Sequence, residues 1–129
     1  MKNGQTVLLY NIRSDRGMRI RTLCVKMGFK IRSIEKEQYS RPIGYLAGLD
    51  GFADSGESFS GEGFDDEMMI MSGFTGTALS MFLDAFKKNK IAPVALKAVI
   101  TETNKDWDSI MLHDELTKER AALTRERGN

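Results

Sequence analysis

Two nearly continuous apolar runs constrain the fold of this chain more than any other feature. The first is Thr6 to Ile12 (TVLLYNI), and the second is Glu67 to Ser72 (EMMIMS). Strands that alternate in polarity expose one face to water, whereas strands without alternation are typical of sheets covered on both faces. The two runs therefore predict two central strands of a sheet that carries helices on both faces.

The stretch between Asp15 and Gly28 has the period of an amphipathic helix. Its apolar residues recur three and four positions apart. They are Ile20, Leu23, Cys24 and Met27. Asp15 is predicted to cap the start of this helix, and Gly28 to follow its end in left-handed backbone. Cys24 is predicted to be buried and unreactive, since no His or metal-ligand residue stands near it at a motif spacing.

A second helix is predicted after the turn Gly73-Phe74-Thr75-Gly76, with Thr75 as its cap. Its core residues are Leu79, Phe82, Leu83 and Phe86. Lysines at its end, Lys87, Lys88 and Lys90, complement the negative end of the helix dipole.

Two shorter runs predict edge strands, because each carries a charge within an otherwise apolar pattern. Phe29 to Ile34 alternates with Lys30 and Arg32, and Val94 to Thr101 contains Lys97. Charged side chains on edge strands prevent mispairing with other sheets. The chain thus predicts a single domain, 1–129, made of two βαβα-like halves, 1–49 and 67–129.

The predicted class is α/β, a four-stranded sheet with helices on both faces. A ferredoxin-like α+β sandwich is the alternative, because it also places the first and third strands centrally. The link from Ile34 to Glu67 decides how the halves pair. If Pro42 to Leu49 is a crossover helix the pairing is parallel, and if it lies aside the pairing is antiparallel.

Charge is distributed unevenly along the sequence. Residues 1–41 carry ten Lys or Arg and three acids, whereas 42–86 carry eight acids and no Lys or Arg. Segment 50–67 holds seven of these acids and four Gly, so we predict a flexible acidic loop. Its phenylalanines, Phe52, Phe59 and Phe64, are expected to dock on the chain's own body or on a partner. Docking on a second copy would give a weak, salt-sensitive homodimer.

The compartment is predicted from what the sequence lacks. A single cysteine forms no internal disulfide, the apolar runs are too short to span a membrane, and the N-terminus has no signal-peptide core. We therefore expect a cytoplasmic chain without a membrane partner.

The candidate binding site follows the last predicted strand. Thr103 and Asp106 have the spacing of a capping box and predict a helix start near Asp106. Ligands of open α/β sheets lie at the carboxyl ends of strands. The candidate ligand-binding residues are Gly73, Phe74, Thr75, Gly76, Thr101, Asn104 and Trp107. In the alternative interpretation Thr101 and Asn104 only satisfy backbone groups, and Trp107 only fastens the helix to the sheet.

Catalysis is not indicated by the sequence. His113 is the only histidine, and no Ser, Cys or second His completes a triad or a metal site. We expect no catalytic residue, metal or cofactor. The predicted function is a small non-catalytic ligand-binding module or a protein-interaction and regulatory module. The alternative is a nucleic-acid-binding protein that uses the basic first third, which a sequence pI of about 7.8 disfavours.

The two turns of the candidate site also belong to motifs that resemble a known family. The Gly73-Phe74-Thr75 turn, the Lys97-Ala98-Val99 strand and the Thr101-x-Thr103-Asn104-x-x-Trp107 run resemble a bacterial family known only as a domain of unknown function. The resemblance covers Met68 to Glu119. Residues of the first half resemble the stretch that precedes that domain in longer members. They are Tyr39, Pro42, Gly44, Leu46 and Gly48. The resemblance implies no activity.

Overall fold

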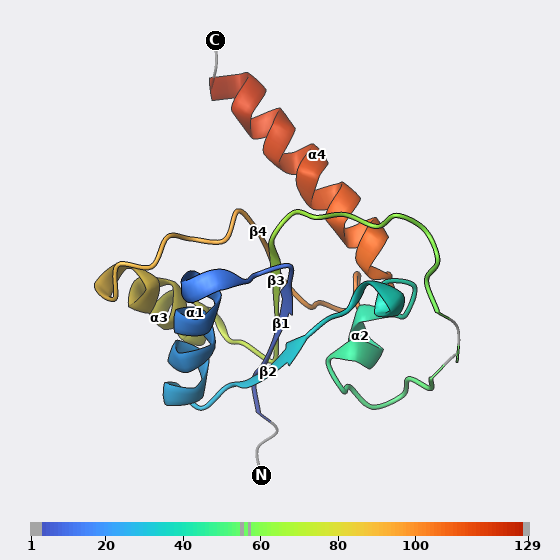
Figure 1. Ribbon diagram of the computed structural model, residues 1–129, viewed down its shortest axis with the longest axis horizontal. Coiled ribbons are helices and arrows are strands. Elements are labelled where there is room, and N and C mark those ends of the chain that lie inside the picture. Colours follow the sequence, from blue (N-terminus) through green and yellow to red (C-terminus); the bar gives the residue numbers. More distant parts are fainter. Residues whose placement is uncertain (1–3, 55, 57, 128–129) are drawn as a thin grey trace.

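A four-stranded mixed sheet, with strands in the order β2-β1-β3-β4, forms the centre of the molecule (Figure 1). The computed structural model describes residues 4–54, 56 and 58–127. In chain order the elements are β1 (Thr6–Tyr10), α1 (Ser14–Lys26), β2 (Lys30–Ser33), the 3-10 helix η1 (Lys36–Gln38), α2 (Ile43–Leu46), β3 (Met68–Ser72), α3 (Gly76–Lys88), β4 (Leu96–Val99) and α4 (Ser109–Arg127). The predicted α/β class is confirmed.

The two apolar runs form the central strands, as predicted. All five residues of β1 and all five of β3 are buried. The charged strands β2 and β4 occupy the edges, where the side chains of Lys30 and Arg32 are exposed. Continuous burial of the central strands explains why neither alternates in polarity.

Strand pairing settles the relation between the halves. β1 pairs with β2 and β3 with β4 in parallel, whereas β1 and β3 are antiparallel, with Leu8 opposite Ile70. The stretch from Pro42 to Leu49 is therefore not a crossover. The ferredoxin-like alternative is wrong, because that fold splits each βαβ unit with another strand, whereas β1 and β2 are direct neighbours here.

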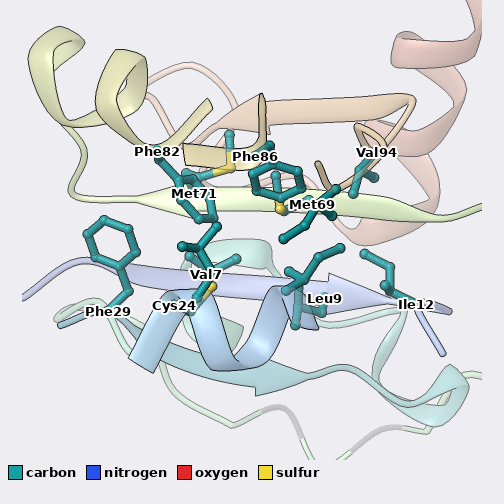
Figure 2. Packing of buried hydrophobic residues seen from close by; sticks show 13 residues of the cluster. Val7, Leu9, Ile12, Cys24, Phe29, Met69, Met71, Phe82, Phe86 and Val94 are labelled. Carbon is teal, nitrogen blue, oxygen red and sulfur yellow. The ribbon is translucent and has the colours of Figure 1, made fainter. Parts of the chain in front are cut away.

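Side-chain alternation along β1 and β3 divides the core into two clusters, one on each face of the sheet. On the first face, the central strands contribute Val7, Leu9, Met69 and Met71 to a cluster with α1 and α3 (Figure 2). On the second face, they contribute Leu8, Tyr10, Met68 and Ile70 to a cluster with α2, the start of α4 and segment 59–66. Figure 1 shows α1 and α3 on one side of the sheet, with α2 and the start of α4 on the other.

Two of the predicted helix ends are confirmed and one is wrong. Thr75 caps α3, since its Oγ1 accepts a hydrogen bond from the Ala78 amide at 3.0 Å. Gly28 follows α1 with φ of 85°. Asp15 does not cap α1, because the helix begins one residue earlier and Arg13 is its N-cap, without a side-chain hydrogen bond. Asp15 lies in the first turn instead, where its charge still suits the helix dipole.

The acidic segment forms no helix or strand in its described residues and lies on the chain's own body. Phe64 is buried in the second-face cluster and Phe59 packs against it. Four of its acids pair with body residues: Glu67 with Arg16 at 2.7 Å, Asp66 with His113 at 2.8 Å, Asp65 with Lys36 at 3.6 Å and Asp54 with Arg41 at 3.7 Å. Docking on the own body is thus the alternative that the structure shows. The flexibility of the loop and the homodimer stay predictions.

The longest helix, α4, runs outward from the sheet toward the C-terminus (Figure 1). Residues 118–124 on it are exposed. Among the described residues, no helix is both long and apolar enough to cross a membrane.

Candidate functional site

The two predicted turns follow the carboxyl ends of β3 and β4. Because these neighbouring strands are parallel, both turns lie at the same end of the strands. Gly73 has φ of 79°, and a Cβ there would lie 3.2 Å from the carbonyl oxygen of Gly4. Gly76 begins α3 and its Cβ position is open. The turn from Gly73 to Gly76 therefore has a local structural role, in which glycine permits the tight backbone and Thr75 caps the helix.

The polar groups of the second turn bind the turn's own backbone. The Thr101 amide donates to Asn104 Oδ1 at 2.8 Å, and the Asn104 amide donates to Thr101 Oγ1 at 3.2 Å. Asn104 Nδ2 also donates to the carbonyl of Val99 at 3.1 Å. Both side chains are thus committed to holding the turn that leaves β4, as in the alternative interpretation of these residues.

The predicted capping box of Thr103 and Asp106 is wrong. Residues 102–106 form turns, and α4 begins at Ser109. Its cap is Asp108, whose Oδ1 accepts from the Met111 amide at 2.9 Å. Several polar residues before this helix could have capped it, so its start was ambiguous in the sequence. The Ile43 amide donates to the Trp107 carbonyl at 2.8 Å, and this long-range hydrogen bond holds the backbone at Trp107 outside the helix.

The aromatic residues of the two turns pack on opposite faces of the sheet. Phe74 lies against the first-face cluster, with its ring centroid 4.6 Å from that of Phe29. Trp107 packs against the second-face cluster. The predicted residues consequently lie at the same end of β3 and β4 but do not form one surface.

A hollow lies beside β2, and we call it the β2 pocket. Its volume is about 600 Å³. It is formed by β2, the segment through η1 and α2, and the start of the acidic segment. The residues that line it are Arg32, Ser33, Ile34, Gln38, Arg41, Tyr45, Leu46, Gly48, Leu49 and Phe52. Cationic, amide, hydroxyl and aromatic groups are therefore present together in one concave surface.

Two glycines shape this pocket. A Cβ at Gly44 would lie 2.5 Å from Phe52 Cε2 and 3.0 Å from the carbonyl oxygen of Lys105, so glycine lets Phe52 pack closely on α2. Gly48 has φ of 82°, and its Cβ position is 3.3 Å from the guanidinium of Arg32. The short α2 and its tight end thus bring the edge strand and the acidic segment together.

The guanidinium groups define the electrostatics of the pocket. Arg32 Nη1 donates to the carbonyl of Leu46 at 3.0 Å, which anchors the side chain across α2. Arg41 lies with Cζ 6.0 Å from the ring centroid of Tyr45, and its Nε is 3.7 Å from Asp54 Oδ1. A smaller hollow of about 340 Å³ adjoins the pocket, shares Arg32 with it and includes Lys30. Positive charge therefore continues along the edge strand.

Other titratable groups of the core are arranged for packing. Burial raises the pKa of the Cys24 thiol to about 12, which the charge of Arg21 only partly offsets. Burial also raises the pKa of the Tyr10 hydroxyl above its usual value, despite its 2.6 Å hydrogen bond with Ser109 Oγ. Both groups stay protonated at neutral pH, so neither supplies an anionic nucleophile.

His113 lies at the docking point of the acidic segment. Its ring stacks on Phe64 with centroids 4.0 Å apart, and its Nε2 is 2.8 Å from Asp66 Oδ2. The ring thus fastens the segment to α4. Across the described residues, no three His, Cys, Asp or Glu side chains gather where they could hold a metal ion.

The β2 pocket was not predicted from the sequence as a site. The alternation of Lys30 and Arg32 was interpreted only as protection of an edge strand, and Gly44 and Gly48 only as part of a resemblance. The signal that could have indicated the pocket is two closely spaced glycines, one in a short helix and one just after it, that follow a basic edge strand. The contact of Phe52 with Gly44 carries no local sequence signature.

Comparison with known proteins concerns the second half of the chain. Residues 67–123 match the family model described as Domain of unknown function (DUF3783). The match confirms the resemblance seen in the turn and strand motifs, and it spans β3, α3, β4 and most of α4. It brings no catalytic assignment. No curated protein and no solved structure is significantly similar to the chain. The β2 pocket lies outside the matched residues.

Proposed function

We propose that this chain is a non-catalytic binding module that holds an anionic ligand in the β2 pocket. The observation that carries the proposal is the pair of guanidinium groups, Arg32 and Arg41, in the wall of a hollow of about 600 Å³. Arginine binds carboxylate and phosphate oxygens through charge-assisted hydrogen bonds. The rings of Tyr45 and Phe52 supply apolar area beside them. The volume of the pocket lies within the range of small-molecule sites.

A carboxylate of the chain itself already lies beside one of the pocket arginines, which supports an anionic ligand. Asp54 lies 3.7 Å from Arg41, and half of its side chain is exposed. An exposed ion pair of that length contributes about 0–1 kcal/mol. A ligand carboxylate that also contacts Arg32 would therefore displace Asp54 at little cost.

Two other arginines of the first third, Arg16 and Arg21, are committed to the fold. Arg16 pairs with Glu67 and donates to the carbonyl of Pro93 at 2.8 Å. Arg21 donates to the carbonyl of Ile12 at 3.0 Å and to Ser33 Oγ at 2.8 Å. Because these two guanidinium groups are held by the fold, they are less available to phosphates, which favours a localised anion site over nucleic-acid binding through the first third.

The test is a titration of the isotope-labelled chain with citrate and pyrophosphate, followed through amide chemical shifts. We expect saturable shifts at Ser33 and Gly48 that weaken as salt rises. Arg32→Gln should weaken binding about tenfold, the loss of one charge-assisted contact. Lys88→Gln is the matched control, because it removes an exposed charge outside the pocket. Asp54→Asn should strengthen binding slightly.

Two results would overturn the proposal. One is equal binding by the wild type and Arg32→Gln, with both folded to the same melting temperature. The other is tighter binding of a random single-stranded oligonucleotide that shifts amides along α1, which would establish the nucleic-acid alternative.

A further inference from the structure

A separate cavity lies on the first face, between α3 and β4, far along the chain from the β2 pocket. Its volume is about 320 Å³. The residues that line it are Met69, Leu83, Asp84, Phe86, Lys87, Ile91, Pro93, Val94 and Lys97. Figure 2 shows Met69, Phe86 and Val94 close together at one end of the core. The cavity is thus an extension of the apolar core that opens at the surface, and we call it the α3–β4 cavity.

Lys97 brings a cation to this apolar wall. It stands opposite Met69 in the parallel pairing of β3 and β4, and its side chain is half-buried. Its Nζ donates to the carbonyl of Val94 at 2.8 Å. An ammonium group has three donors. In the part of the chain that the structure describes, this neutral carbonyl is the one hydrogen-bond acceptor of Nζ, and no carboxylate pairs with it.

The charges around Lys97 favour binding of an anion next to it. Burial lowers the pKa of the Lys97 ammonium, and the nearby positive charge of Arg120 lowers it further. Lys87 adds a second ammonium to the cavity wall, against the single carboxylate of Asp84. A half-buried cation that faces another cation is electrostatically unfavourable, and a bound anion would relieve it.

We infer that the α3–β4 cavity binds a small organic carboxylate with an apolar body, whose carboxylate pairs with Lys97 Nζ and whose hydrocarbon part lies against Leu83, Phe86 and Val94. Both parts of such a ligand match a feature of the cavity. The hydrocarbon part would gain about 25 cal/mol for each Å² of apolar surface it buries. The carboxylate would supply the anionic partner that Lys97 lacks among the described residues. This site is independent of the β2 pocket.

The alternative is that Lys97 serves only to protect an edge strand from mispairing. In that case the cavity needs no anion, and removing the charge would change aggregation but no ligand affinity.

The experiment uses octanoate as the probe and octanol as its uncharged counterpart, with binding followed by methyl chemical shifts and by calorimetry. We expect octanoate to shift the methyl signals of Met69, Leu83 and Val94 saturably, and octanol to bind about tenfold more weakly or not at all. Lys97→Met, which keeps an apolar stem, should weaken octanoate binding about tenfold or more and leave octanol unchanged. Lys88→Met is the matched control outside the cavity.

A second variant keeps the test independent of the stability of Lys97→Met. Leu83→Trp fills the cavity from α3 and should abolish octanoate binding, while Lys97→Arg should retain it. Absence of saturable shifts, or equal octanoate affinity in the wild type and Lys97→Met, would overturn the inference. So would equal binding of octanol and octanoate, or self-association of the chain through this face in sedimentation.

Discussion

The two faces of the sheet are closed in different ways. The first face is covered by α1 and α3, two helices of 13 residues each, and its cluster is apolar apart from the thiol of Cys24. The second face is covered by the four-residue α2, the irregular segment 59–66 and the first turns of α4. Polar contacts hold these pieces, including Tyr10 with Ser109 and His113 with Asp66. The stability of the first face therefore depends on close packing of apolar side chains. The stability of the second face depends also on specific polar contacts between its pieces.

This difference also separates the two cavities. The β2 pocket includes Ile34 and Leu46 of the second-face cluster, and its polar wall consists of groups from short, irregular pieces. The α3–β4 cavity includes Met69 and Phe86 of the first-face cluster, with one half-buried cation on its wall. A face assembled from several short segments can present many polar groups in one hollow, whereas a face closed by long helices leaves mainly apolar space.

The largest effect is expected from loss of volume on the first face. Phe82 is fully buried, and its ring centroid lies 5.1 Å from that of Phe29 and 5.3 Å from that of Phe86. Phe82→Ala should lower the free energy of unfolding by about 3–5 kcal/mol, because it leaves a cavity among helices that cannot collapse. Chemical denaturation measures the change. The control is Met81→Ala on the exposed side of α3, where a comparable loss would contradict the assignment of Phe82 to the core.

A smaller effect is expected from the equivalent deletion on the second face. Phe64 stacks on Tyr39 at 4.5 Å and on His113 at 4.0 Å between centroids. Phe64→Ala should cost about 2–3 kcal/mol, below the usual range for buried Phe, because an irregular segment can shift to fill the space. Limited proteolysis should become faster between residues 58 and 66 while the first face stays protected. A loss as large as that of Phe82→Ala would show that the two faces are equally rigid.

Over a single pH unit, the smallest effect is expected from a loss of stability at alkaline pH, to which Cys24 on the first face and Tyr10 on the second contribute. The folded state raises the pKa of Cys24 from 9.0 to about 12, so it favours the protonated thiol. The stabilisation is complete below pH 9 and is lost as pH rises toward 12, by up to about 1.4 kcal/mol for each pH unit. The pKa of Tyr10 is also raised, from 10.0, so its contribution begins to fall one unit higher.

Urea unfolding at successive pH values separates the two groups. Cys24→Ala should flatten the curve from pH 9 upward, and Tyr10→Phe only above pH 10. If neither variant changes the slope, other groups dominate the alkaline transition, and the contributions assigned to Cys24 and Tyr10 are wrong.

Strand order and burial were predictable because they follow from local pattern. The runs that became β1 and β3 lack polar alternation, and the charged runs that became β2 and β4 lie at the edges. The antiparallel relation of the halves was not predictable, since it depends on the path of the link after Ile34. Helix starts were predicted where one polar residue stood in place, as at Thr75, and missed where several competed, as at Asp106 and Asp108.

The candidate site shows the same division between local and distant information. The sequence correctly placed two turns at neighbouring strand ends, but the pattern Thr101-x-x-Asn104 is equally suited to binding a ligand and to holding a turn. The β2 pocket depends on contacts between segments that no local spacing specifies, such as that between Gly44 and Phe52. Among the described residues, the contact of Lys97 Nζ with a carbonyl rather than a carboxylate likewise becomes visible only when its neighbours are placed.

The hydrogen bond between Tyr10 and Ser109 joins residues 99 positions apart, and the Ile43 and Gly44 amides at the start of α2 donate to carbonyls of Trp107 and Lys105. The second face is therefore completed only by residues made late in synthesis. While the chain leaves the ribosome, β1, α1 and β2 can associate early, but the first turn of α2 has no backbone acceptors until the segment beyond β4 has emerged. High sequence separation of these contacts should make closure of the second face the slow step of folding.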